Sequence, residues 1–311
     1  MIARYLPEAG SALLAQHLEV DEGGAEAVAE TLHARVAGAA ALVSDPTVRV
    51  DGELLDAAGE SLKAVANFAV GYDNIDVEAC RERGVVVTNT PDVLTNATAE
   101  LTLGLLLAAA RRLGEGERLL RAGDWTGWEP GQLLGRELSG SVVGIVGLGR
   151  IGARVAELLR GFDVTLLCTS RSPHPEEESR LGAERVPLDE LLARADFVTL
   201  HAPLGPETRH LIDDAALDRM KQGAVLVNTS RGGLVDSAAL ARALADGRLF
   251  AAGLDVYDHE PDVPHELLAL ENVVLTPHMG SATSRARDGM AELVARNVIA
   301  VLAGRAPLTP V

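Results

Sequence analysis

Residues 142–159, VVGIVGLGRIGARVAELL, combine an apolar strand, a glycine-rich turn and the start of an amphipathic helix. Gly147, Gly149 and Gly152 stand in the order G-x-G-x-x-G. In this pattern the first glycine allows a tight turn, the second lets backbone approach a pyrophosphate, and the third allows close helix–strand packing. The free N–H groups at the helix start then favour phosphate. The stretch predicts a dinucleotide-binding βα unit, with a plain tight turn as the alternative.

Apolar runs of strand length alternate with helical patterns along the whole chain. Because these runs show no polar alternation, they suit parallel sheets covered on both faces, in an α/β fold. A largely apolar stretch at 92–112 predicts a long buried helix, 173–179 reads as a polar loop, and 285–304 predicts an amphipathic final helix that returns to the first domain. Strands are expected at 40–44, 62–69, 84–90, 141–147, 163–169, 196–202, 224–230, 250–256 and 272–278.

Composition limits the possible classes of partner. The chain has 311 residues, enough for two domains, and with 47% apolar but only 3% aromatic residues its cores must consist of Ala, Leu and Val. The net charge of −17 would repel a polyphosphate backbone, so no nucleic-acid partner is expected.

The two cysteines, Cys80 and Cys168, have neither metal-ligand nor redox-pair spacing. We expect them to be buried apolar side chains in a reducing compartment, and we expect no metal site. The N-terminal residues lack the pattern of a secretory signal, and the apolar stretch 101–110 is too short to span a bilayer. These features predict a soluble cytoplasmic protein without a membrane partner.

The strand at 163–169 leads into Ser170, Arg171 and Ser172, about 20 residues after the glycine turn. A dinucleotide site usually places an acidic residue here to accept the adenosine ribose hydroxyls. An acid would repel a 2′-phosphate, whereas serine can donate a hydrogen bond and arginine supplies a planar cation. The substitution favours NADP over NAD. The alternative is a solvated loop arginine beside a pocket that accepts both cofactors.

Arg231 and Glu260 follow predicted strands of the second half, and His278 closes another. Ligands of open parallel sheets bind outside the carboxyl ends of the strands, so the three side chains are expected to converge there. Each also has a structural interpretation: Arg231 as a turn brace, Glu260 as a loop cap, and His278 as an ordinary satisfied histidine. Their convergence favours chemistry.

These three residue types suit the reduction of a 2-oxo acid. A guanidinium holds a carboxylate with two donors. Hydride arriving at the carbonyl carbon creates an alkoxide, which a histidine can protonate near neutral pH. A carboxylate beside the imidazole stabilises the protonated form. His201, near the end of the strand predicted at 196–202, is a weaker candidate that could line the cofactor cleft.

The chain resembles the D-isomer-specific 2-hydroxyacid dehydrogenases over nearly its whole length. The resemblance lies in AVGYDNIDVEACRERGVVVTNTP, TAELTLGLLL, VGIVGLGRIG, NTSRGGLVD, AAGLDVYDHEP and LTPHMGSAT. It implies a Rossmann-type, doubly wound cofactor domain at 94–283, inserted into a flavodoxin-like substrate domain built from 1–93 and a return helix at 284–311. It also implies a homodimer.

The resemblance assigns roles to individual residues. Arg231 would bind the substrate, His278 would be the acid/base, and Glu260 would orient and charge His278. The backbone at Val70 and Gly71 would help to hold the carboxylate. The residues implied to approach the cofactor are Thr98, Gly147, Leu148, Gly149, Arg150, Ile151, Gly152, Ser170, Arg171, Ser172, Pro203, Thr208, Thr229, Ser230, Asp255 and Gly280.

Within the family, PDVLTNATAE, the Trp125–Trp128 pair and the Ser-Arg strand end are most similar to glyoxylate/hydroxypyruvate reductases. In that subfamily the tryptophan loop can reach a partner's substrate pocket, which makes Trp128 a candidate substrate residue. Met279 stands where isoleucine is more familiar, a soft apolar exchange. The resemblance thus implies reduction of glyoxylate or hydroxypyruvate to the D-2-hydroxy acid, with NADPH preferred and NAD possible.

Three other interpretations share the framework. Phosphite dehydrogenases carry a lysine before the substrate-loop glycine, where this chain has Val70. Phosphoglycerate dehydrogenases usually prefer NAD, and many carry an extra regulatory domain. Some corepressors use the same fold as a dinucleotide-sensing binding protein without turnover.

Overall fold

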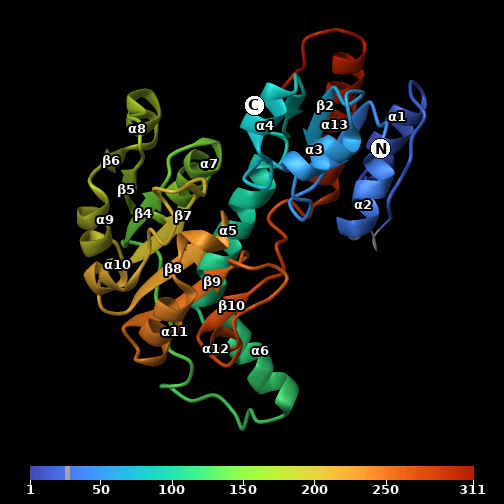
Figure 1. The fold of residues 1–311 in the computed structure, drawn as a ribbon. Coiled ribbons are helices and arrows are strands. Elements are labelled where there is room, and N and C mark those ends of the chain that lie inside the picture. The colour runs from blue at the N-terminus through green and yellow to red at the C-terminus, as the bar shows by residue number, and fades with distance from the viewer. Residues whose placement is uncertain (25–28) are drawn as a thin grey trace. The chain divides into compact units, whose positions relative to one another are not determined.

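The computed structural model describes residues 1–24 and 29–311. They form two compact units, one of Met1–Leu94 with Ser281–Val311 and one of Thr95–Gly280 (Figure 1). The unit boundaries thus fall at 94/95 and 280/281, where the sequence led us to expect 93/94 and 283/284. The first unit is built from both ends of the chain.

The first unit contains a parallel sheet in the order β1-β2-β3. Single parallel bridges join Ile2 to both Val43 and Glu22. With these bridges counted as rudimentary strands, the lateral order becomes 2-1-3-4-5, the flavodoxin-like order. The elements are β1 (Ala41–Ser44), β2 (Ala64–Asn67), β3 (Val86–Thr88), α1 (Glu8–Ala15), α2 (Ala29–Val36), α3 (Gly52–Ala58), α4 (Val77–Glu82) and α13 (Ser284–Leu302).

The second unit contains a seven-stranded parallel sheet in the order β10-β9-β8-β7-β4-β5-β6. Numbered within the unit, its first six strands follow the 3-2-1-4-5-6 order of Rossmann folds, so the topological switch lies between β4 and β7. This confirms the predicted fold class. The strands are β4 (Val142–Val146), β5 (Thr165–Thr169), β6 (Ala183–Arg185), β7 (Phe197–Leu200), β8 (Ala224–Asn228), β9 (Leu249–Leu254) and β10 (Val273–Leu275).

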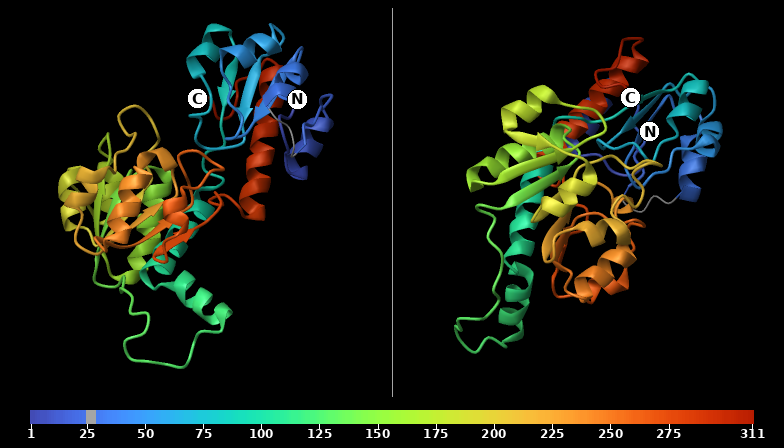
Figure 2. Two further views of the ribbon diagram at one scale, coloured as in Figure 1. Left: turned by 60° about the horizontal axis from the view of Figure 1, so that its bottom comes forward. Right: turned by 90° about the vertical axis from the view of Figure 1, so that its left-hand side faces the viewer.

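Helices cover both faces of this sheet (Figures 1 and 2). α5 and α7 lie on one face, and α9 and α11 lie on the other. Along β4, Ile145 packs into the core on the side of α5 and α7, and Val146 packs into the core on the side of α9 and α11. Both faces of the strand are therefore apolar. The helices are α5 (Thr95–Ala110), α6 (Leu113–Ala122), α7 (Arg150–Leu159), α8 (Pro175–Leu181), α9 (Leu188–Arg194), α10 (Asp214–Arg219), α11 (Ser237–Ala245) and α12 (His265–Leu268), with 3-10 turns at Arg160–Phe162 and Gly232–Leu234.

The prediction of a polar loop at 173–179 is wrong, because α8 begins at Pro175. Proline is well tolerated at a helix start, and the three glutamates 176–178 in the first turn complement the positive end of the helix dipole. Gly182 ends the helix in the left-handed conformation, with φ +66°. The short strand β6 that follows was also missed.

The long apolar helix is confirmed as α5, but only one of its faces is fully buried. Leu105 and Leu106 lie in the core, whereas Leu103 and Leu107 are half-buried and Gly104 is exposed. α6 then extends from the layers of its unit and leads into the loop 123–137 (Figure 2). α6 contains no buried residue.

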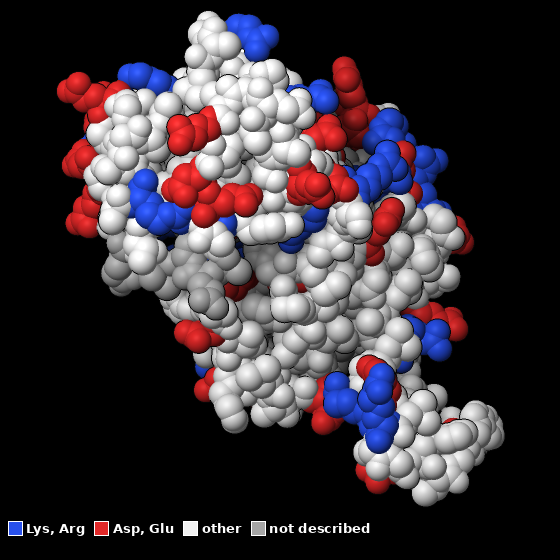
Figure 3. Space-filling view, turned by 90° about the vertical axis from the view of Figure 1, so that its right-hand side faces the viewer, with Lys and Arg blue, Asp and Glu red and all other residues white. Residues whose placement is uncertain are grey.

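Both cysteines are unpaired and buried, as predicted, and burial raises the pKa of Cys80 and of Cys168 to about 11. Among residues 1–24 and 29–311 no helix is long and apolar enough to cross a membrane. The same part of the chain holds no group of three His, Cys, Asp or Glu that could bind a metal ion. On the face shown in Figure 3, basic side chains lie beside acidic ones and form no continuous field.

Candidate active site

The glycine turn between β4 and α7 has the form that dinucleotide binding requires. Gly147 has φ +100°, and a Cβ there would lie 2.7 Å from the backbone nitrogen of Ala202. A Cβ on Gly152 would collide with the carbonyl oxygen of Gly147. A Cβ on Gly149, in contrast, meets no atom of the described residues within 4 Å. The protein itself thus requires the first and third glycines, and the second borders open space at a helix N-terminus, which fits a bound pyrophosphate.

We therefore expect Gly149→Ala to separate folding from cofactor binding. The new methyl group has room in the protein, so thermal stability should change little, but it fills the space where a pyrophosphate would approach the backbone. Dinucleotide affinity, measured by calorimetry, should fall at least about tenfold. Gly152→Ala is the contrasting variant, because overpacking should cost it about 1–3 kcal/mol of stability. Unchanged affinity in Gly149→Ala would contradict this interpretation.

The turn after β5 holds the residues expected to read the adenosine ribose. Arg171 is exposed, and its guanidinium makes no hydrogen bond or ion pair with the described residues. The hydroxyl of Ser170 donates to the carbonyl oxygen of Ser172 at 2.6 Å. Arg171 is thus available to an anion, whereas the Ser170 proton is already used within the turn.

Arg185 is a neighbour of this turn that the sequence analysis missed. It ends β6, and its Nη2 donates to the carbonyl oxygen of Ser170 at 3.1 Å. Its Nε lies 3.8 Å from a carboxylate oxygen of Glu178, which also accepts from the backbone nitrogen of His174 at 2.8 Å. Arg185 and α8 together brace the turn.

His278 and Glu260 meet as predicted. Nδ1 of the imidazole lies 2.6 Å from Oε2 of the glutamate. His278 has φ +50°, a left-handed conformation that few non-glycine residues adopt, and its backbone nitrogen donates to the carbonyl oxygen of Asp255 at 2.9 Å. Glu260 is held in turn by the backbone nitrogen of Tyr257, at 3.0 Å from Oε1. The carboxylate therefore fixes both the position and the hydrogen bonding of the ring.

Burial alone would raise the pKa of Glu260. The hydrogen bonds from His278 and Tyr257, together with the charges of His278 and Arg231, outweigh burial and hold the pKa of Glu260 below its usual value. The carboxylate is thus ionised throughout the range in which a histidine titrates.

Arg231 lies at the end of β8, close enough for its charge to act on Glu260. The turn that carries it is fixed by Asn228, whose side chain donates to the Arg231 carbonyl oxygen at 2.8 Å and accepts from the Ser230 nitrogen at 3.0 Å. A Cβ on Gly232 would collide with the backbone of Tyr257. This close approach brings the Arg231 turn against the segment that leads to Glu260.

Thr98, Thr229, Asp255 and Gly280, all predicted to approach the cofactor, lie together. Thr98 donates through Oγ1 to the carbonyl oxygen of Gly280 at 3.1 Å, and the nitrogen of Gly280 donates to Asp255 at 2.8 Å. Asp255 also accepts from Thr276 at 2.6 Å. Burial raises the pKa of Asp255, opposed by these hydrogen bonds.

His201 lies beside the glycine turn but is chemically different from His278. Burial lowers the pKa of His201 to about 3, so its ring stays neutral and cannot act as an imidazolium acid near pH 7. The hydroxyls of two other predicted cofactor residues hold the loop after β7 in place. Thr208 donates to the carbonyl oxygen of Pro203 at 2.8 Å, and Ser230 donates to that of Ala202 at 2.6 Å.

Some predicted cofactor residues can offer only backbone. The side chain of Leu148 is buried in the core, so only its main chain is available to a ligand. Ile151 is half-buried and packs against the same core, and Arg150 is exposed at the start of α7.

Val70 and Gly71 belong to the first unit. Their carbonyl oxygens accept from the side chains of Asn89 and Asn67, each at 2.8 Å. Among the described residues neither backbone N–H donates a hydrogen bond. Both N–H groups are therefore available to an anionic group.

The two tryptophans lie in the loop 123–137, which follows α6. Trp128 is 80% exposed, and the Trp125 indole donates to Gln132 at 3.2 Å. The loop 123–137 that carries both residues continues from α6, away from the sheet of its unit (Figure 2).

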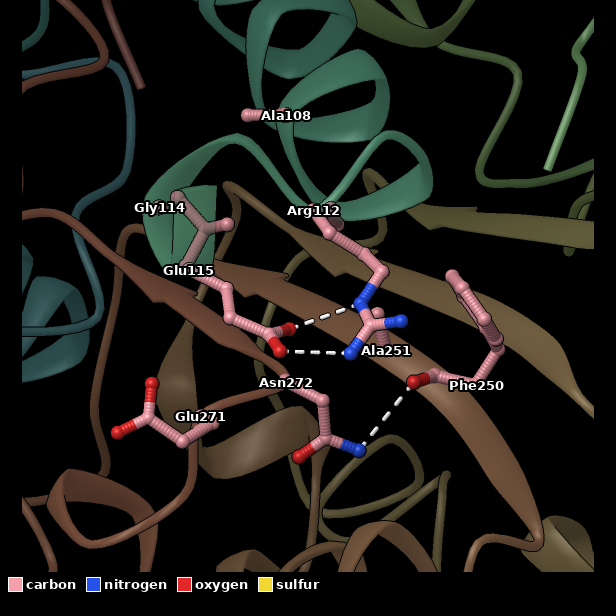
Figure 4. A pocket seen from close by; sticks show the side chains of 10 residues that line it. Ala108, Arg112, Gly114, Glu115, Phe250, Ala251, Glu271 and Asn272 are labelled. Carbon is pink, nitrogen blue, oxygen red and sulfur yellow. Dashed lines mark hydrogen bonds and ion pairs between the residues drawn. The ribbon is translucent and has the colours of Figure 1, made fainter. Parts of the chain in front are cut away.

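A cavity of about 230 Å³ lies elsewhere in the second unit (Figure 4). It is lined by the end of α5, the start of α6 and the beginnings of β9 and β10. The cavity therefore lies at the amino ends of the strands, whereas the glycine turn follows the carboxyl end of β4. Its polar groups are paired: Arg112 donates twice to Glu115, at 2.8 and 2.6 Å, and Asn272 donates to the Phe250 carbonyl oxygen at 3.2 Å. It is therefore not the dinucleotide site.

A Rossmann-type sheet with a glycine turn and a histidine–carboxylate pair at its strand ends defines a nicotinamide-dependent dehydrogenase. Residues 103–280 match the family model described as D-isomer specific 2-hydroxyacid dehydrogenase, NAD binding domain. The chain belongs to the D-isomer-specific 2-hydroxyacid dehydrogenase family.

Known proteins agree over the full length. A glyoxylate reductase of Thermococcus onnurineus is 50% identical, over 99% of this chain and 94% of its own. A crystal structure of a Thermus thermophilus protein superposes with a TM-score of 0.93 at 47% identity, over 100% of this chain and 98% of that one. The crystal structure of an NADPH-dependent glyoxylate/hydroxypyruvate reductase of Sinorhizobium meliloti, solved with NADP and malonate, superposes with a TM-score of 0.87. It is 35% identical, over 100% of this chain and 95% of that one.

Proposed function

We propose that the chain reduces a small 2-oxo acid, glyoxylate or hydroxypyruvate, to the D-2-hydroxy acid with NADPH. The 2.6 Å contact between Nδ1 of His278 and Oε2 of Glu260 carries the proposal, because a carboxylate hydrogen-bonded to the imidazole supports a role of His278 as the proton donor. The relatives support the substrate class, since one is a glyoxylate reductase and another a glyoxylate/hydroxypyruvate reductase.

The glycine turn at Gly147, Gly149 and Gly152 would hold NADPH, which would supply the hydride that reduces the carbonyl carbon. Arg231 would hold the substrate carboxylate with two donors of its guanidinium. We propose the N–H groups of Val70 and Gly71, which donate to no described residue, as further carboxylate donors within the first unit. Because Nδ1 of His278 is hydrogen-bonded to Glu260, Nε2 is the nitrogen that delivers a proton to the carbonyl oxygen. The unit Thr95–Gly280 thus acts as the cofactor domain and the other unit as the substrate domain.

The most direct test is turnover with a panel of 2-oxo acids, each assayed with NADPH and NADH. Glyoxylate and hydroxypyruvate with NADPH should give the highest kcat/KM. Oxidation of phosphite in preference to these acids would favour the phosphite dehydrogenase alternative. Dinucleotide binding without turnover of any acid would indicate a sensor.

The guanidinium of Arg171, which has no partner among the described residues, supports the preference for NADPH. We expect Arg171→Ala to raise the KM for NADPH about 10-fold or more, because the ribose 2′-phosphate loses a charge-assisted hydrogen bond. The KM for NADH should stay within about twofold, since NADH has no 2′-phosphate.

Arg180→Ala is the matched control for this change. Arg180 is a nearby exposed arginine whose guanidinium is already paired with Glu177 at 2.6 Å. Its loss should leave both KM values unchanged. Equal effects of Arg171→Ala on NADPH and NADH would refute the assignment.

We further propose that a second copy of the chain covers the arm formed by α6 and the loop 123–137. Large apolar side chains cluster there without cover, and the outer face of α5 at its base is only half-buried. In such a homodimer Trp128 would reach the partner's substrate pocket. The exposed apolar residues of the arm are Leu113, Leu120, Trp125, Trp128 and Leu134.

A further inference from the structure

Thr102 is a buried polar residue that no sequence motif marked as functional. It is fully buried, one helical turn after Thr98, on the face of α5 that packs against β8 and β9. Its Oγ1 makes two hydrogen bonds, one of 2.8 Å to the carbonyl oxygen of Thr98 and one of 2.7 Å to Oγ1 of Thr229.

Counting protons fixes the direction of both bonds. A hydroxyl carries one proton, and a carbonyl oxygen can only accept. Because Thr102 donates its proton to the Thr98 carbonyl, the proton between the two hydroxyls must come from Thr229. Thr229 then has no proton left for a ligand and can only accept.

Two neighbouring side chains, those of Thr98 and Asp255, can likewise only accept a further hydrogen bond. The Thr98 hydroxyl proton is used on the carbonyl oxygen of Gly280. Asp255 accepts from the nitrogens of Met279 and Gly280, each at 2.8 Å. We call Thr98, Thr229 and Asp255 the acceptor corner, because each hydroxyl proton is already used and the carboxylate has none, so that these side chains could only accept a further hydrogen bond.

The position of this corner indicates which ligand group it meets. It lies at the carboxyl ends of β8 and β9. The backbone N–H of His278 donates a hydrogen bond to the carbonyl oxygen of Asp255, which brings His278 next to the corner. A dinucleotide with its pyrophosphate on α7 and its adenosine at β5 extends its other half across the switch point, toward β8 and β9. That half carries the nicotinamide, whose carboxamide offers an N–H₂ donor. A nicotinate in its place would bring a negative charge and only acceptors.

We propose that Thr102 is a positioning residue that sets the hydrogen-bond polarity of Thr229, so that the site takes the carboxamide form of the dinucleotide and rejects the carboxylate form. This inference rests on the nicotinamide cofactor of the proposed function, but not on the identity of the 2-oxo acid.

The test compares the affinity of the full chain for NADP⁺ and for nicotinic acid adenine dinucleotide phosphate, measured by calorimetry without substrate. The two ligands differ only in the carboxamide. The wild type should prefer NADP⁺ by at least about 100-fold, since an acceptor-only pocket faces an anion. Thr102→Val should weaken NADP⁺ binding about 5- to 10-fold. It should also reduce the preference at least about tenfold, because the Thr229 hydroxyl can then turn outward and donate.

Thr102→Ser keeps the hydroxyl and should restore the preference. Thr199→Val is the matched control: Thr199 is a fully buried threonine on β7 whose hydroxyl has no partner among the described residues, so the same change should leave the preference intact. If Thr102→Val fails to fold, Thr102→Ala removes the same hydroxyl and must give the same loss.

An unchanged preference in the folded Thr102→Val or Thr102→Ala variant would overturn the proposal, as would a serine variant that behaves like valine. A wild type that binds both ligands equally would overturn it as well. Selective binding of NADP⁺ without turnover of any 2-oxo acid would refute the proposed substrate and leave the role of Thr102 supported.

Discussion

Arg231→Lys is expected to lower kcat/KM for glyoxylate at least about 100-fold, although the positive charge is kept. A guanidinium meets a carboxylate with two parallel donors and fixes its plane, whereas an ammonium is a point charge that leaves the acid free to rotate. Hydride transfer needs the carbonyl carbon in one orientation, so the loss should appear in both KM and kcat.

The structure supplies the reason for this sensitivity. The side chain of Asn228 fixes the Arg231 turn by donating to the Arg231 carbonyl oxygen. Nη1 of Arg231 donates to the carbonyl oxygen of Ser230 at 2.9 Å. A shorter lysine would start from the same rigid backbone and could not recover the geometry by a local shift.

Arg242→Lys is the control, an identical exchange at an exposed arginine on α11 that pairs with Asp214 at 2.7 Å. It should leave kcat/KM within about twofold, since exposed pairs contribute little. A near-normal kcat/KM in Arg231→Lys would show that another group recognises the carboxylate.

The sequence was informative where one physical constraint acts on a local stretch. Apolar runs without polar alternation predicted buried parallel strands, because β4 and its neighbours are covered on both faces. The glycine turn was predictable because Gly147 and Gly152 have no room for a Cβ. Arg231, Glu260 and His278 could be placed together because they follow strand ends of one parallel sheet.

Features that depend on distant contacts could not be predicted in this way. The pairing of Thr102 with Thr229 joins residues 127 positions apart, and in the sequence Thr102 is one small residue within an apolar helix. Arg185 was missed because β6 has only three residues and two of them are exposed. The acidic run before β6 suggested a solvated loop, although Pro175 and Gly182 at its ends were local signals of a helix.

His278→Ala is expected to lower kcat for reduction about 10²- to 10⁴-fold, the usual contribution of a general acid. NADPH binding should remain nearly intact, because the glycine turn and Arg171 are untouched. His259→Ala is the matched control: His259 also lies near a carboxylate, 3.7 Å from Asp258, but its side chain is 82% exposed and should not matter for turnover.

Glu260→Gln should lower kcat less than His278→Ala does, and it should shift the pH dependence of kcat. The pKa of Glu260 is held below its usual value, so the wild-type imidazole has an ionised carboxylate beside it wherever a histidine titrates. That carboxylate favours the protonated ring, which is the form that reduction needs, and glutamine removes the preference. The protonated form then persists over a narrower range, so the descending limb of the pH–rate profile should shift to lower pH. If the limb stayed in place while His278→Ala remained active, the pair would be structural, and a different group would have to protonate the substrate oxygen.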